Sequence, residues 1–230
     1  MTGLSGALRA FVEEFPEERR SLLVFVRSVA AGLPPGARLL DAAAGSAPYR
    51  ELFAHCDYVT TDWERSPHAA AGADVLGSLA ALPLDDETFD AVLCTQALEH
   101  VAEPLAVLGE LRRVLRPGGR LFLTAPLAWE LHEEPHDYYR YTVHGLAHLF
   151  VEAGFRVESI APRNGAFTTL AGLARTTRAG LWADTGSRRR RIVADRLLRA
   201  VVVLLPRFDD LDGRRLLPLG YCCVAVRPAS

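Results

Sequence analysis

The densest group of side chains capable of chemistry lies in residues 129–142, which read WELHEEPHDYYRYT. His136 and His132 are the leading candidates for a catalytic base, because imidazole titrates near neutral pH. Their spacing of four residues also suits a divalent metal shared with a carboxylate such as Asp137. Pro135 interrupts any helix that would align the two rings. A polar, hydrogen-bonded loop is therefore favoured and no metal is expected.

The same segment carries aromatic and cationic groups that suit contact with a small substrate. The candidates for substrate contact are Trp129, Tyr138, Tyr139 and Arg140. Arg140 can bind a carboxylate or phosphate of a bound molecule, but an ion pair with a neighbouring acid is an equally ordinary role. Those acids are Glu133, Glu134 and Asp137. Substrate contact and loop architecture both stay open for this segment.

A second candidate region follows the first apolar run of the chain. Residues 41–47 read DAAAGSA and come where a short strand meets the next element. Open α/β sheets bind ligands beyond the carboxyl ends of their strands, and small side chains let a ligand approach the backbone. Gly45 alone keeps unrestricted backbone freedom in this turn. The turn is a candidate for ligand contact.

The elements that must position these groups alternate in type along the chain. Strands are predicted over 38–43, 58–61, 89–95, 120–125, 155–161 and 220–226. Helices are expected to start at Pro16 and at Ala47, to span 104–115, and to run from a Thr142 cap to 153. This repetition predicts an α/β fold with a doubly wound, mostly parallel sheet and helices on both faces.

The chain is expected to form a single domain over residues 1–230. Its parts are an N-terminal helical segment (1–36), a cofactor-binding core (37–161), a helical insertion (162–219), and the last strand and tail (220–230). The insertion is too long for a hairpin loop, so it is predicted to be a lid, a dimer surface or a side-packing helix pair. Its arginine run at 188–191 favours a solvated helix face, and residues 209–213 favour an acidic turn over a calcium loop.

Six short segments occur in an order that is typical of one enzyme family. They are DAAAGSA (41–47), TDW (61–63), ALPL (81–84), FDAVLC (89–94), LEHV (98–101) and LRPGG (115–119). Over residues 38–161 this series resembles the class I S-adenosylmethionine-dependent methyltransferases, particularly the methyltransferase type 11-like branch. The resemblance implies a Rossmann-like sheet of seven strands, the cofactor S-adenosyl-L-methionine, and methyl transfer to a small-molecule acceptor, with natural-product or sugar and lipid metabolism as settings.

The resemblance also implies roles for the turn at 41–47. Asp41 matches the acid that opens the glycine motif, and Gly45 matches its central glycine beside the methionine part of the cofactor. Ala43 and Ala47 stand where the family has glycine. Each alanine adds a methyl group, which the backbone tolerates if φ stays negative.

Further cofactor contacts follow from the same resemblance. Asp62 matches the acid that accepts hydrogen bonds from both ribose hydroxyls, with a turn aspartate as the alternative. Trp63 matches the side chain that packs on adenine, and Ser78 with Leu79 matches the pair at the adenine edge, although the family more often has aspartate at the first position. The residues expected near the methionine end are Thr95, Gln96 and His100.

The composition of the chain limits which classes of partner are expected. A net charge of -2 and a pI near 6.4 give no overall attraction for nucleic acid, so a polynucleotide substrate is not expected. No signal peptide is recognised at the start of the chain, and the apolar run at 197–206 is too short to span a membrane, which makes a cytoplasmic location the default.

Three alternatives remain beside methyl transfer. One is a protein of this fold that binds the cofactor without transferring methyl. Another is a nicotinamide-dependent oxidoreductase that uses Asp62 for ribose, although the chain lacks a convincing glycine fingerprint for it. The third is a non-enzymatic scaffold that forms a homodimer through residues 197–205.

Overall fold

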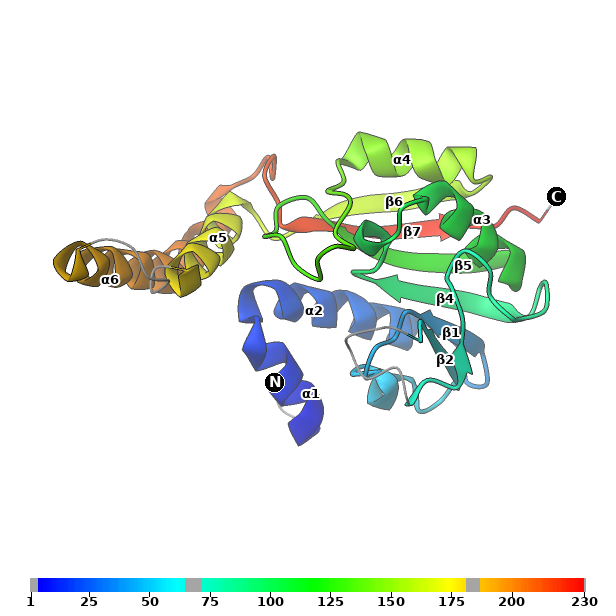
Figure 1. The fold of residues 1–230 in the computed structure, drawn as a ribbon. Helices are drawn as coiled ribbons and strands as arrows, with labels where there is room; N and C mark the ends of the chain where they lie inside the picture. Colours follow the sequence, from blue (N-terminus) through cyan, green and yellow to red (C-terminus); the bar gives the residue numbers. More distant parts are fainter. Residues whose placement is uncertain (1–3, 65–71, 181–186, 230) are drawn as a thin grey trace.

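The computed structural model describes residues 4–64, 72–180 and 187–229, and these residues build one seven-stranded sheet (Figure 1). Its strand order is β3-β2-β1-β4-β5-β7-β6. The strands are β1 (Arg38–Ala42), β2 (Asp57–Asp62), β3 (Val75–Leu76), β4 (Phe89–Thr95), β5 (Leu115–Pro126), β6 (Arg156–Arg163) and β7 (Gly220–Val226). β7 runs antiparallel to both neighbours and the other pairs are parallel. The predicted Rossmann-like α/β fold is confirmed.

Helices cover both faces of this sheet, as the sequence predicted (Figure 1). The helices are α1 (Gly6–Glu14), α2 (Pro16–Gly32), α3 (Pro104–Val114), α4 (Val143–Glu152), α5 (Ala166–Gly180) and α6 (Arg188–Leu204). Three short 3₁₀ turns are used below: η1 (Arg50–Phe53), η3 (Leu98–His100) and η4 (Leu205–Leu211). Neighbouring strand residues serve opposite faces, because Leu39 packs with α1 and α2 whereas Leu40 packs with α3 and α4.

Helix α2 carries the start signals that the sequence predicted. Pro16 occupies its first turn, and Glu17 and Glu18 lie where negative charge stabilises the helix dipole. Leu22 and Val26 are buried on one face of the helix. This packing brings the first turn of α2 over the carboxyl ends of the strands, beside the cavity described below.

Two predicted boundaries are wrong. Ala47 has a positive φ of 51°, so no helix begins there, and the single turn η1 follows it. Helix α3 ends at Val114 rather than at Leu115, because Leu115 already pairs with Phe89 as the first residue of β5. The pairing then shifts between Phe89 and Ala91, so residues 116–119 form an irregularity within β5 instead of a separate turn.

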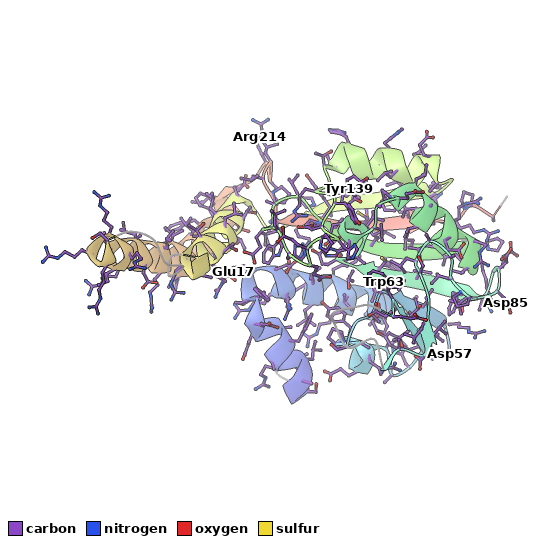
Figure 2. The ribbon with its side chains drawn as sticks, in the orientation of Figure 1. Glu17, Asp57, Trp63, Asp85, Tyr139 and Arg214 are labelled. Atoms are coloured by element: carbon purple, nitrogen blue, oxygen red, sulfur yellow. The ribbon has the colours of Figure 1, made fainter. Side chains whose placement is uncertain are left out.

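The predicted helical insertion is present between β6 and β7 and extends beyond the sheet as α5, α6 and η4 (Figure 1). Asp209 accepts hydrogen bonds from the backbone amides of Gly165 (2.6 Å) and Thr168 (2.8 Å) at the start of α5. The acidic turn therefore caps a helix. Arg175 of α5 binds the carboxylate of Glu17, a residue labelled in Figure 2. This ion pair ties the extension to α2.

The surface of this extension is apolar in part. Leu197, Val203 and Leu204 are exposed on α6, within the segment expected to form a dimer interface. Self-association through it stays a prediction, as does the division of the chain into one domain with an insertion. In the part of the chain that the structure describes, no helix combines the length and apolarity needed to cross a bilayer.

Candidate functional site

A cavity of about 1080 Å³ opens at the carboxyl ends of β1, β2 and β4. β1 lies between β2 and β4, so the chain leaves this point of the sheet in both directions, which is where open α/β sheets bind ligands. All ten residues predicted to contact the cofactor line the cavity: Asp41, Ala43, Gly45, Asp62, Trp63, Ser78, Leu79, Thr95, Gln96 and His100. Trp129, His132, His136 and Tyr138 also line it.

The turn after β1 differs from expectation in its backbone. Ala43 and Ala47 have φ values of 58° and 51°, and Gly45 has 56°. The condition under which the backbone tolerates alanine easily, a negative φ, is therefore not met at either position. An L-residue in this left-handed region costs about 1–2 kcal/mol, because its Cβ approaches the following carbonyl oxygen. The chain keeps the strained turn without the glycines that usually occupy it.

The carboxylate of Asp62 is fixed by two backbone amides. Gly45 N donates to Oδ2 at 2.7 Å and Trp63 N donates to Oδ1 at 2.6 Å. The side chain is buried at the end of β2, yet it borders the cavity. Because a carboxylate oxygen accepts more than one hydrogen bond, each oxygen can still receive a hydroxyl from a ligand. Asp62 is thus both a turn aspartate and a group available to a diol.

Trp63, which the resemblance predicts to pack on adenine, lines the cavity and is 39% exposed. The ring of His136 packs edge to face against Trp63 with centroids 5.3 Å apart. Ser78 and Leu79 form the neighbouring wall. His136 therefore lies with the residues predicted to hold the nucleoside, away from the end of β4 where the methyl group is expected.

At the end of β4, Gln96 adopts a positive φ of 49° and its side-chain amide donates to Thr124 Oγ1 at 2.9 Å. Arg163 lies buried behind Gln96, 3.4 Å from its amide oxygen and 3.6 Å from the Glu18 carboxylate. Sequence reasoning missed this arginine and the cavity wall from α1 and α2, which includes Phe11, Phe15, Glu18 and Arg19. The start signal at Pro16 located the helix but did not show which face it turns to the site.

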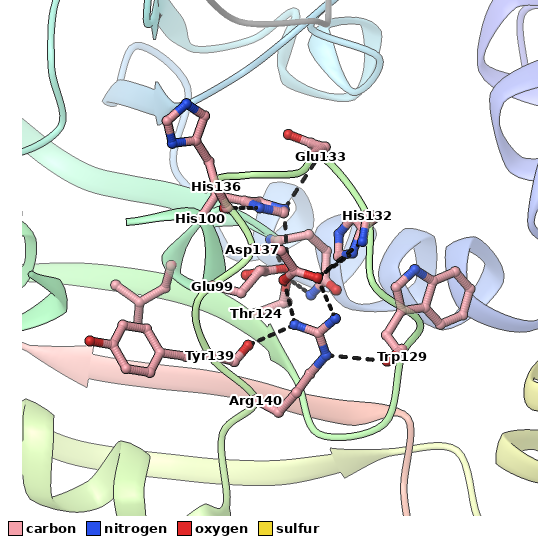
Figure 3. Close-up of polar contacts among 12 residues, drawn as sticks. Glu99, His100, Thr124, Trp129, His132, Glu133, His136, Asp137, Tyr139 and Arg140 are labelled. Atoms are coloured by element: carbon pink, nitrogen blue, oxygen red, sulfur yellow. Dashed lines mark hydrogen bonds and ion pairs between the residues drawn. The ribbon is translucent and has the colours of Figure 1, made fainter. Parts of the chain in front are cut away.

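Arg140 and Tyr139 do not reach the cavity, although substrate contact was predicted for both. Arg140 instead binds both oxygens of Asp137, at 2.6 and 2.8 Å, and donates to the backbone carbonyls of Trp129 and Glu130. The Tyr139 hydroxyl donates to the Ala102 carbonyl at 2.9 Å. In the structure both residues make architectural contacts: Arg140 binds within the loop (Figure 3), and Tyr139 ties the loop to the segment after η3.

His132 faces a different neighbour from the one that its spacing suggested. Its ring packs edge to face on His100 with centroids 4.6 Å apart, and its Nδ1 lies 3.4 Å from Asp137 Oδ2. Figure 3 shows the His136 ring pointing away from this group. A metal bound by His132 and His136 would require the two rings to face each other. In the structure His132 instead faces His100.

Burial sets the electrostatics of the site. It raises the pKa of Asp41 to about 7, even though the Tyr58 hydroxyl donates to this carboxylate. It also raises the pKa of Glu99 to about 8 and lowers the pKa of His100 below its ordinary value. Hydrogen bonds from Arg140 hold the pKa of Asp137 well below the usual range. Burial thus favours the uncharged forms of Asp41, Glu99 and His100, whereas Asp137 in the loop stays ionised.

Comparison with known proteins identifies a family that part of this chain matches. Residues 40–123 match the family model described as a methyltransferase domain. Residues 40–123 are therefore similar to a methyltransferase domain, and this match covers less than half of the chain. The demethylmenaquinone methyltransferase of Renibacterium salmoninarum is 37% identical over 103 residues, which cover 40% of this chain and 42% of that protein. The match thus spans about two fifths of the length of this curated relative.

Solved structures agree on the fold across most of the chain. The (4+2)-cyclase SpnF aligns with a TM-score of 0.59 and 19% identity over 91% of this chain and 81% of that chain. The Haemonchus contortus phosphoethanolamine N-methyltransferase 2 in complex with S-adenosyl-L-methionine aligns with a TM-score of 0.55 and 15% identity, over 92% of this chain and 53% of that chain. At these identities the likeness concerns the fold.

Proposed function

We propose that this chain binds S-adenosyl-L-methionine in the cavity at the carboxyl ends of β1, β2 and β4 and transfers its methyl group to a small-molecule acceptor. The observation that carries the proposal is the position of Asp62. Its fixed carboxylate borders the cavity at the end of β2, one residue before the exposed ring of Trp63. A carboxylate that can accept hydrogen bonds from two ribose hydroxyls, next to an apolar ring on which a base can stack, suits a nucleoside.

The turn after β1 supplies the neighbouring part of the cofactor site. Gly45 joins this turn to Asp62 through its amide, so the glycine motif and the ribose acid form one unit. Thr95 and Gln96 border the cavity at the end of β4, where the methionine end is expected. The cofactor would therefore lie across β1, with adenine toward β3 and the sulfonium toward β4.

The remaining wall suits an acceptor with an apolar or aromatic body. Phe15, the residue between α1 and α2, and Trp129 of the loop pack edge to face with ring centroids 6.0 Å apart, and Phe11 lies in the same wall. Methyl transfer from a sulfonium is a displacement with an already activated donor, so the protein mainly aligns the acceptor and excludes water. An aromatic acceptor is compatible with the relative named demethylmenaquinone methyltransferase.

Of the two predicted histidines, His132 is the better placed to act on the acceptor. It lies between Trp129 and His100, and the ionised carboxylate of Asp137 orients its ring. His136 packs on Trp63, on the nucleoside side of the cavity. We therefore assign the acceptor side to His132 and the adenine side to His136, which reverses the order of preference given by the sequence.

Calorimetric titration with S-adenosylhomocysteine tests the cofactor site. Asp62→Ala is expected to weaken binding by about 1–3 kcal/mol, the scale for removing a charged hydrogen-bond partner. Asp57→Ala is the matched control. Asp57, labelled in Figure 2, begins the same strand at its far end, and its side chain forms an exposed ion pair with Arg38. Equal affinities in the parent and both variants would refute the ribose assignment. Binding without any methyl transfer would favour the cofactor-binding alternative.

A further inference from the structure

Glu99 is a fully buried acid whose carboxylate oxygens lack hydrogen-bond partners among the described residues. It lies in η3 directly after β4 and has no solvent-exposed surface. Neither of its carboxylate oxygens accepts a hydrogen bond from another described residue. A buried carboxylate is normally paired or bound to a metal, since its desolvation is otherwise uncompensated. Burial favours the neutral form of this carboxyl, but even then its two oxygens have no hydrogen-bond partner among the described residues, so Glu99 has the capacity to bind an additional group.

Two imidazoles face the same point. The Nδ1 atom of His100 lies 2.9 Å from the His136 carbonyl, and that of His132 lies 3.1 Å from the Glu130 carbonyl. A carbonyl oxygen can only accept, so each Nδ1 carries the hydrogen and each Nε2 of the neutral ring carries a lone pair. His100 Nε2 is buried and has no hydrogen-bond partner among the described residues. Two carboxylate oxygens lie near it, Glu133 Oε1 at 3.8 Å and Glu99 Oε1 at 4.0 Å, and both are too far for a hydrogen bond.

We propose that Glu99, His100 and His132 bind one divalent transition-metal cation, of the class of Zn²⁺ or Mn²⁺. One ligand atom from each of the three residues lies within 4.8 Å of the others. Two imidazoles and one carboxylate are a common ligand set for such ions. The positive charge would compensate the buried carboxylate, and the lone pairs on Nε2 would become ligands.

The surroundings of the two histidines match those of metal ligands. Metal-binding imidazoles usually donate their other ring nitrogen to a carbonyl or carboxylate, which fixes the ring orientation. His132 has both, because Asp137 Oδ2 lies 3.4 Å from the same Nδ1 that faces the Glu130 carbonyl. Asp137 is itself held by Arg140. The ion pair that withdraws Arg140 from the cavity thus serves to hold His132 in place.

The position of the cation would define the acceptor, and this step rests on the proposed function. His100 and His132 line the cavity whereas Glu99 lies behind them, so the open coordination positions would face the acceptor. A hydroxyl bound there would lose its proton to water more readily, because the cation stabilises the oxyanion. Its oxygen would then form a bond to the methyl carbon while the carbon–sulfur bond breaks to give the thioether. The acceptor is thereby an oxygen nucleophile.

The test is titration of the full chain, stripped with a chelator, with Co²⁺ followed by visible absorption and with Zn²⁺ followed by calorimetry. One ion per chain is expected. Glu99→Gln and His132→Gln should each weaken binding by at least about 100-fold, while Glu158→Gln and His148→Gln, which lie outside the cavity, should leave it unchanged. Either of the two ligand variants suffices if the other fails to fold.

S-adenosylhomocysteine binding by the same metal-free protein separates this inference from the proposed function. A parent chain that binds S-adenosylhomocysteine but no cation would overturn the metal site and leave the cofactor site standing. Cation binding that all four variants weaken equally, or that Glu99→Gln leaves intact, would also overturn it, since the ion would then be held by surface groups. A parent chain that binds the cation but not S-adenosylhomocysteine would count against the proposed function and leave the metal site standing.

Discussion

Two buried carboxylates lie at the cavity, and they differ in their hydrogen bonds. Asp62 belongs to the part at the ends of β1 and β2, here called the cofactor half, and Glu99 lies behind the part formed by His100 and the loop at 129–142, here called the acceptor half. In the cofactor half, Asp62 is satisfied by the amides of Gly45 and Trp63, so its position is fixed by the backbone before any ligand binds. In the acceptor half, Glu99 is more deeply buried and neither oxygen accepts a hydrogen bond from another described residue. The first carboxylate is thus preorganised by the backbone, whereas the second is the group for which we propose a bound cation.

The strongest way to break this comparison is to destroy the preorganised half. Gly45→Val is expected to abolish S-adenosylhomocysteine binding, a loss of at least about 100-fold, because a β-branched residue does not tolerate a φ of 56° and the amide to Asp62 would move. Circular dichroism should still show a folded chain.

Gly36→Val is the matched control for that variant. Gly36 has a φ of 79° in the loop before β1, at the end of the strand opposite the cavity. It should lower stability and leave the affinity for S-adenosylhomocysteine intact. Retained affinity in Gly45→Val would mean that the turn after β1 is not the cofactor turn.

The acceptor half is expected to lose stability rather than affinity when its internal ion pair is removed. Arg140→Ala should lower the free energy of unfolding by about 3 kcal/mol, because Asp137 is almost fully buried and would keep an unpaired charge. Arg156→Ala removes an exposed ion pair with Glu158 and should cost less than about 1 kcal/mol. Urea unfolding compares them, and equal losses would show that the loop is held by other contacts.

The roles of the two histidines sharpen the boundary between the halves. Once an acceptor has been found by release of S-adenosylhomocysteine, His132→Gln should lower turnover on the order of 100-fold and spare cofactor affinity. His136→Gln should lower turnover by less than about tenfold and weaken cofactor binding slightly, because it removes a ring contact with Trp63 worth about 0.5–1.5 kcal/mol. The opposite pattern would return the acceptor to His136.

The smallest expected effect is a change in the pH dependence of stability. Burial raises the pKa of Asp41 from 3.8 to about 7 in the folded chain, so the native state binds this proton more tightly than the unfolded state. The resulting stability is fully present below about pH 4 and is lost as the pH rises through 7. In Asp41→Asn this decline should be shallower. Parallel curves of unfolding free energy from pH 4 to 8 for parent and variant would contradict the shift.

The sequence grouped the ten predicted cofactor residues around one cavity because they follow strand ends. Each strand pattern locates a carboxyl end, and the parallel sheet brings Asp41, Asp62 and Thr95 to one edge without further information. What it could not supply was backbone conformation. Nothing in the letters of residues 41–47 indicated that Ala43 and Ala47 would adopt positive φ.

The acceptor half was harder because its contacts join residues far apart in the chain. The loop at 129–142 was correctly located, but sequence spacing paired His132 with His136, whereas the folded chain pairs it with His100. Arg140 carried two readings of equal weight, and only the position of Asp137 decided between them. The helical wall from Phe11 and Phe15 was missed, since an amphipathic pattern gives a buried face but not its neighbour.

The central claim is that this cavity binds S-adenosyl-L-methionine. Parallel calorimetric titrations of the parent chain with S-adenosylhomocysteine and with NAD test it most directly. The account predicts one S-adenosylhomocysteine per chain and no measurable binding of NAD. Binding of NAD, or no heat with S-adenosylhomocysteine from a chain that is folded by circular dichroism, would contradict it.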